Sequence, residues 1–191
     1  MRIYPLFVCG ALILMGACAT IKNPTALKDT AVTATENNAG AIHQPEPTYV
    51  APFNWRVAQA AGTPKGGVIA NVTLIRPELA GNMTLSIILS GGLTPLARAE
   101  QESDQLSDSM LDVLVSEAAE SLTDPPEASF NWKGPSPSNP DVERMSGKVI
   151  FRQIPGHPEL LAMCQGWWPE SSHEFLISPL HRACESVRLS D

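Results

Sequence analysis

The feature that most limits the fold is a series of short apolar segments separated by Gly and Pro turns. Residues 68–76 alternate between the two faces of an extended strand, and residues 83–89 follow after the turn signal Gly81-Asn82. Alternation with a period of two is typical of β-strands. Further strand-like segments lie at residues 130–132, 144–153, 160–168 and 175–177. A sheet is therefore expected.

Two segments are expected to be helical. Thr94 and Pro95 suit the cap and the first position of a helix, and no further Gly or Pro occurs before Pro125. Residues 94–122 are therefore expected to form one helix, or two with a bend near Ser103. Its buried face is expected to carry Leu106, Met110, Val113, Leu114, Ala118 and Leu122. A short helix is expected over residues 180–189. Together these elements predict an α+β fold, a mostly antiparallel sheet with a long helix and a short C-terminal helix packed on it.

The N-terminus is expected to be an export signal. Arg2 precedes a short apolar run at residues 6–15, which is too short for a bilayer span of about twenty residues. The residues Met15-Gly16-Ala17-Cys18 resemble a bacterial lipobox, in which an aliphatic and two small residues precede an obligatory cysteine. The resemblance implies removal of residues 1–17 and acylation of Cys18. The alternative is an ordinary cleaved signal with Cys18 near the junction by chance.

The residue after the cysteine bears on location. Enterobacterial lipoproteins that stay in the inner membrane favour an aspartate there, and this chain has Ala19. The lipobox resemblance therefore implies a lipid anchor in the bacterial envelope, in the outer membrane and facing the periplasm.

The composition divides the rest of the chain into a tether and one domain. Residues 18–52 contain few large apolar side chains, and Pro45, Pro47 and Pro52 favour extended structure. This stretch is expected to be a lipidated N-terminus and disordered tether, although Tyr49 favours packing of its last few residues. Residues 53–191 are expected to form a single domain.

The cysteines suggest a disulfide. Cys9 lies in the signal and Cys18 is the lipid site, which leaves Cys164 and Cys184 as a pair in an oxidising compartment. Two free buried thiols are one alternative. A zinc site with His173 and His181 is another, but no CxxC or HxxxH spacing supports it. The disulfide is favoured, and no metal is expected.

Two surface features are candidates for protein binding. In a strand, Trp167 and Trp168 point to opposite faces, so one is expected in the core and the other at solvent or at a second layer. An exposed tryptophan is a typical interface anchor. The predicted long helix also carries acidic residues every four positions, at Glu100, Asp104, Asp108 and Asp112. These form a docking face for a basic partner, a weak Ca²⁺-binding site or a solvated outer face, and no calcium-loop pattern supports the second.

The net charge and the absence of catalytic motifs limit the classes of function that are expected. The net charge of -7 disfavours nucleic-acid binding. The sequence contains no GxSxG, SxxK, HExxH or P-loop motif, so neither catalysis nor a cofactor is expected. The expected function is that of a non-catalytic envelope lipoprotein that binds another envelope protein. A small-ligand or metal-binding lipoprotein and a hydrolase with a dispersed site are the alternatives.

The element order and the lipobox support one further resemblance. Two strands, a helix, several strands and a final helix resemble the order in PsbP-like domains and DcrB-type bacterial lipoproteins over about residues 66–189. This resemblance implies a small sheet between helices and a non-catalytic role.

Overall fold

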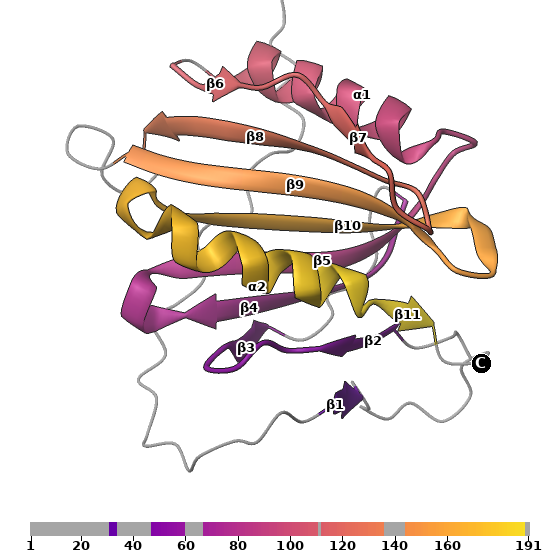
Figure 1. Cartoon of the computed structure of the whole chain (residues 1–191), viewed down its shortest axis with the longest axis horizontal. Helices are drawn as coiled ribbons and strands as arrows, with labels where there is room; N and C mark the ends of the chain where they lie inside the picture. Colours follow the sequence, from indigo (N-terminus) through magenta and orange to yellow (C-terminus); the bar gives the residue numbers. More distant parts are fainter. Residues whose placement is uncertain (1–30, 34–46, 60–66, 111, 136–143, 190–191) are drawn as a thin grey trace, which may run out of the picture.

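The computed structural model describes residues 31–33, 47–59, 67–110, 112–135 and 144–189 (Figure 1). Its main sheet contains eight strands, β3 (Arg56–Gln59), β4 (Val68–Arg76), β5 (Gly81–Leu89), β6 (Leu114–Val115), β7 (Ala119–Ser121), β8 (Glu127–Pro135), β9 (Arg144–Ile154) and β10 (His157–Pro169). Their order is β3-β4-β5-β10-β9-β8-β6, and β7 also pairs with β8. Every pairing is antiparallel.

A smaller sheet joins the two ends of the described chain. It consists of β1 (Ala31–Thr33), β2 (Pro47–Val50) and β11 (Arg188–Leu189), with β2 in the middle. Tyr49 is buried in the main core, so the folded body includes the last residues of the expected tether. The rest of that tether outside β1, together with the signal and Cys18, lies outside the described residues.

One helix covers each face of the main sheet (Figure 1). α1 (Pro95–Ser109) packs on β8 and β9, and α2 (His173–Glu185) packs mainly on β10 and β9, with further contacts to β5 and β2. The expected N-cap of α1 is present, because Thr94 Oγ1 accepts a hydrogen bond from the Ala97 backbone N at 3.2 Å. Two short 3-10 turns, η1 (Pro77–Leu79) and η2 (Glu170–Ser172), complete the elements.

The strand residues divide between two apolar clusters. On β10, Leu161 packs with Ala99 of α1, whereas the next residue, Ala162, packs with the α2 side. The central strands are therefore buried on both faces, and β9 has the consecutive buried residues Val149, Ile150 and Phe151. The predicted α+β class is confirmed.

The predicted extent of the long helix was wrong. α1 ends at Ser109, Asp112 has a positive φ of 61°, and the following segments β6 and β7 pair with β8. Leu114 and Leu122, which were expected on the buried face, are 69% and 105% exposed. Val113 and Val115 are β-branched and favour the extended conformation that allows this pairing.

The C-terminal elements were also misplaced. Residues 175–177 are not a strand, because α2 starts at His173 and ends at Glu185, before β11. Leu176, Leu180, Ala183 and Cys184 recur at helical spacing and are all fully buried. Their burial outweighs the cost of Pro179 inside the helix, which removes one backbone donor.

Candidate functional site

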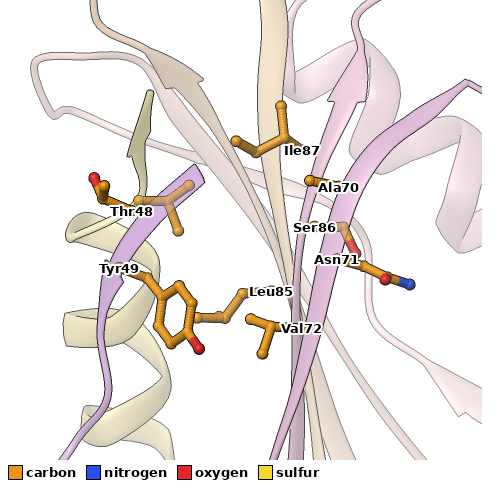
Figure 2. Close-up of a pocket in the computed structure, with 9 residues that line it drawn as sticks. Thr48, Tyr49, Ala70, Asn71, Val72, Leu85, Ser86 and Ile87 are labelled. Carbon is orange, nitrogen blue, oxygen red and sulfur yellow. The ribbon is translucent and has the colours of Figure 1, made fainter. Parts of the chain in front are cut away.

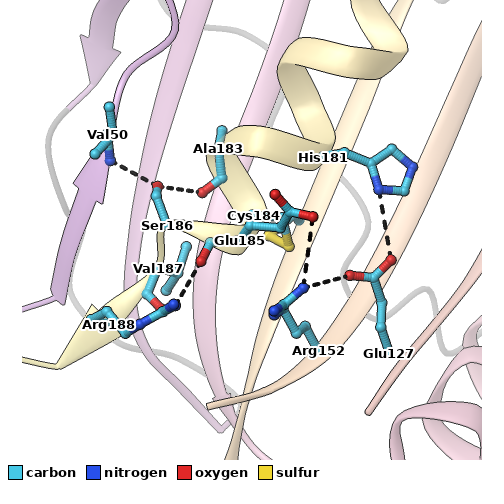
Figure 3. The surroundings of a disulfide bond; sticks show 11 residues. Val50, Glu127, Arg152, His181, Ala183, Cys184, Glu185, Ser186, Val187 and Arg188 are labelled. Carbon is cyan, nitrogen blue, oxygen red and sulfur yellow. Dashed lines mark hydrogen bonds and ion pairs between the residues drawn. A yellow bond between two sulfur atoms is a disulfide. The ribbon is translucent and has the colours of Figure 1, made fainter. Parts of the chain in front are cut away.

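A disulfide attaches α2 to the centre of the sheet (Figure 3). Cys164 of β10 and Cys184 of α2 are joined by an S–S bond of 2.09 Å, and both residues are fully buried. This is the pairing that the sequence favoured. With both sulfurs used, no group of three or more His, Cys, Asp or Glu side chains within the described residues is placed to hold a metal ion.

The two adjacent tryptophans have different environments. Trp168 is fully buried on the α2 side, where its Nε1 donates a hydrogen bond to His173 Nδ1 at 3.1 Å. Its side chain belongs to the core and is not accessible to a partner, so Trp168 is corrected from an interface candidate to a core residue. Trp167 is half-buried on the opposite face, between Gly147 of β9 and Asn82 of β5. Of the pair, Trp167 alone can contact another molecule.

We predict that His173→Ala destabilises the fold by about 1–3 kcal/mol, the usual cost of an unsatisfied buried donor. The substitution removes the acceptor of the buried Trp168 Nε1–H. Urea unfolding followed by tryptophan fluorescence measures the change. His157→Ala, in the β9–β10 hairpin, is the matched control. Equal stability of the two variants would show that the Trp168–His173 bond contributes nothing.

A charged cluster joins α2 to β8 and β9 beside the disulfide (Figure 3). Glu127 of β8 is 3% exposed, with Oε2 at 3.2 Å from Arg152 Nη1 and Oε1 at 3.6 Å from His181 Nδ1. Glu185 Oε1 lies 4.0 Å from the same Arg152 nitrogen. Sequence reasoning did not select Glu127 or Arg152. They lie 25 residues apart, and only the β8–β9 register brings them together.

Burial and neighbouring charges set the protonation of this cluster. Burial lowers the pKa of His181 below its ordinary value near 6.5, and the positive charge of Lys148 lowers it further. The negative charges of Glu127 and Glu185 raise the pKa of His181 and partly offset these effects. Burial also lowers the pKa of Lys148 on β9, and Glu127 partly offsets this effect.

We predict that acid weakens the fold partly through His181. Because the folded-state pKa is depressed, the unfolded chain takes up the proton first as the pH falls. The folded state is therefore favoured fully above about pH 7 and loses stability as the pH falls below the unfolded value near 6.5. Urea unfolding across this range should show a smaller acid loss in His181→Gln than in the wild type. A His157→Gln control should keep the wild-type slope, and an unchanged slope in His181→Gln would contradict the assignment.

The acidic candidates lie on the outer side of α1. Glu100, Asp104 and Asp108 are exposed, and Asp112 is exposed but lies beyond the helix, so the predicted stripe keeps three helical members. Residues 95–124 contain eight acidic residues and one basic residue, a net charge of -7 that equals that of the whole chain. We call Glu100, Asp104 and Asp108 the acidic face.

A cavity between β2 and the β4–β5 pair is lined by Tyr49, Val72, Leu85 and Val187, among others (Figure 2). Its free volume is about 10 Å³, which is about enough for one water molecule and too small for an organic ligand.

None of the helices within the described residues is long and apolar enough to cross a membrane.

The comparisons with known proteins show the fold alone. No protein-family model matches the chain, and no curated protein matches it in sequence. Among solved structures, the Ran-binding protein Mog1p of Saccharomyces cerevisiae is similar with a TM-score of 0.53 and 10% identity, over 87% of this chain and 97% of Mog1p. LpqN, involved in cell envelope biogenesis of Mycobacterium tuberculosis, is similar with a TM-score of 0.50 and 11% identity, over 86% of this chain and 91% of LpqN. The chain therefore has the fold of these two proteins.

Proposed function

We propose that the chain is a lipid-anchored protein of the bacterial cell envelope that binds another protein and catalyses no reaction. The observation that carries the proposal is the lipobox-like sequence ending at Cys18, found on a chain with the fold of LpqN, a protein of cell envelope biogenesis. Mog1p, with the same fold, is a Ran-binding protein, so this fold also serves protein binding. A fold alone does not determine function, and the anchor sequence supplies the independent support.

The proposed anchor sequence also supports a proposal for the membrane in which the protein lies. Ala19 after Cys18 favours the outer membrane by the enterobacterial sorting rule, with the domain in the periplasm. A disulfide between Cys164 and Cys184 suits that oxidising compartment. We also propose that the chain is related to the PsbP-like and DcrB-type lipoproteins, which its order of strands and helices resembles.

The partner is proposed to contact the acidic face and to carry basic side chains. Glu100, Asp104 and Asp108 are all exposed on α1, and the surrounding segment holds charge equal to that of the whole chain. Complementary charge speeds association and excludes partners of the wrong sign. Trp167 is a second proposed contact, because it is the accessible member of the tryptophan pair.

In-cell crosslinking of the tagged full-length chain tests the proposal. We expect one dominant envelope protein in the crosslinked product, and its loss when Glu100, Asp104 and Asp108 are all changed to Lys. The matched control changes three exposed acidic residues elsewhere, Glu78, Glu159 and Glu174, to Lys and adds the same charge. Retention in the control places the partner on the acidic face. Equal loss in both variants, or no crosslinked protein, would contradict the proposal.

A further inference from the structure

We propose that one end of the domain docks on the surface of the lipid bilayer through Val50, Phe53 and Phe175. We call these three residues the apolar end. The proposal rests on the lipid anchor of the proposed function, and it does not depend on a protein partner.

Two phenylalanines differ from the other aromatic residues that the structure describes. Phe53 is 69% exposed and Phe175 is 65% exposed. Every other aromatic side chain of the described residues is buried or half-buried. Single exposed apolar residues are ordinary on a protein surface, whereas exposed apolar residues that gather at one place indicate an interaction site.

Contacts over Gly81 place the two phenylalanines at the same end of the molecule. A Cβ on Gly81 would lie 2.8 Å from Leu176 Cδ1 and 3.3 Å from Trp55 Cη2. The side chains of Trp55 and Leu176 therefore meet over the β4–β5 hairpin. Phe53 lies two residues before Trp55, and Phe175 adjoins Leu176. The β2–β3 turn and the start of α2 are both at the left of Figure 1.

The β2–β3 turn holds Phe53 outside the core. The turn is closed by a hydrogen bond from the Trp55 backbone N to the Pro52 carbonyl oxygen at 3.0 Å. Asn54 has a φ of 67°, a conformation that asparagine adopts more readily than most residues. Because Trp55 is buried in the main core, the turn is attached firmly to the domain. A fixed turn therefore presents Phe53 to the surroundings.

The chain that follows the proposed anchor enters the fold at this same end. β1 and β2 are antiparallel, and Ala31, the first residue of β1, pairs with Val50, the last residue of β2. Val50 is 49% exposed and lies three residues before Phe53. Ala31 follows Cys18 by thirteen residues, and a chain of this length spans at most about 45 Å. The apolar end therefore lies within reach of the membrane that holds Cys18.

The distribution of charge also favours this end for a lipid surface. The acidic residues of segment 95–124 lie along α1, β6 and β7, and β6 is at the opposite edge of the main sheet from β3. Around the apolar end, Arg56 and Arg76 supply two positive charges. Glu78 and Glu174 supply two negative ones. An anionic bilayer therefore meets no excess of negative charge at this end, and the acidic face points away from it.

A weak contact is sufficient for a domain that is already anchored. The anchor keeps the domain at a high effective concentration beside the bilayer, so docking becomes an intramolecular step. Phenylalanine side chains enter the boundary between headgroups and acyl chains. Each phenylalanine is expected to change the ratio of docked to undocked molecules by about tenfold.

Fluorescence quenching in vesicles tests the proposal. The full-length lipidated chain is reconstituted in vesicles of phosphatidylethanolamine and phosphatidylglycerol that carry a nitroxide on a fraction of the lipid headgroups. A fluorophore is attached at Ser178→Cys, an exposed position one helical turn after Phe175. The nitroxide quenches the fluorophore where the domain is docked. We expect strong quenching at this position and weak quenching of a fluorophore at Gln105→Cys, an exposed position on α1.

The introduced cysteine is the one thiol that should react with the fluorophore. Cys164 and Cys184 are joined in the disulfide. Cys18 is the proposed site of acylation, and Cys9→Ser removes the remaining thiol.

Two double variants identify the surface that docks. Phe53→Ser/Phe175→Ser should abolish the quenching and leave the protein bound to the vesicles in a flotation assay. Leu114→Ser/Leu122→Ser removes two exposed apolar side chains from the opposite edge of the sheet and should leave the quenching unchanged. All four side chains are exposed, so both variants should fold. If Phe53→Ser/Phe175→Ser does not fold, each single variant should lower the ratio of docked to undocked molecules by about tenfold.

Flotation and quenching distinguish failure of this proposal from failure of the proposed function. A wild-type chain that does not float with the vesicles contradicts the lipid anchor and, with it, the docking. A chain that floats but shows no quenching at Ser178→Cys overturns the docking alone, as does full quenching in Phe53→Ser/Phe175→Ser. Crosslinking of an unquenched chain to another protein or to a second copy through Phe53 or Phe175 would identify a protein interface and would also overturn the docking.

Discussion

Replacing Cys18 with Ser should move the protein from the membrane fraction to the soluble fraction. The proposed anchor is the acylated cysteine, and serine has no thiolate to accept a lipid. One acyl chain binds a membrane weakly and two or more bind it stably, so loss of all chains should release almost the whole population. Ultracentrifugation of cell lysates followed by immunoblotting measures the distribution.

Cys9→Ser is the matched control, because Cys9 lies inside the expected signal. It should leave the protein in the membrane fraction and preserve incorporation of labelled palmitate, which Cys18→Ser should lose. Unchanged membrane fractionation of Cys18→Ser would overturn the lipid anchor.

Removing the disulfide should have the largest effect on stability. Cys164 and Cys184 enclose a loop with a sequence separation of 20, and loops of this size are stabilised by about 3 kcal/mol. For a domain of this length, the Cys164→Ala/Cys184→Ala variant should melt about 6–12 °C lower than the wild type. Thermal denaturation followed by circular dichroism, with and without reductant, measures the change.

The controls distinguish the effect of losing the disulfide from the effect of losing the packing of the two cysteine side chains. Reductant should lower the melting temperature of the wild type and leave that of the double alanine variant unchanged. Thiol labelling of the denatured mature protein should find neither Cys164 nor Cys184 reactive. Two reactive thiols would refute the disulfide.

Strands were the more predictable part of the fold. Residues 68–76 alternate and end before Pro77, so local sequence determines that strand, and it appears as β4 with the same bounds. Residues 111–122 contain no breaker and fit a helical pattern as well as a strand. Their pairing with β8 depends on a partner strand that begins later, at Glu127, which local periodicity does not reveal. The first part of α2 was missed because Phe175, Leu176 and Ile177 favour strands locally. Burial of Leu176, Leu180, Ala183 and Cys184 at helical spacing on the sheet makes the segment helical.

Some features of the candidate sites could also be predicted from the sequence, and others could not. The disulfide follows from the number of cysteines and the compartment, which a sequence provides directly. The division between Trp167 and Trp168 follows from strand alternation, but which of them is buried depends on the position of α2. Glu127, Arg152 and His181 come from three elements, and their proximity depends on register and on helix placement. Side chains that meet only through tertiary structure leave no local signal.

The small sheet determines where a mechanical load would enter the molecule. Thr48 of β2 pairs with Arg188 of β11, and the Val50 backbone N donates to Ser186 Oγ at 2.8 Å. Tension applied from the N-terminal side at β2 therefore passes to the end of α2, which is cross-linked to β10. The hydrogen bonds of the antiparallel β2–β11 pair resist a pull along the strands. The Cys164–Cys184 disulfide then keeps α2 attached to β10. α1 and the acidic face lie outside this load path, so we expect tension on β2 to leave that face undistorted.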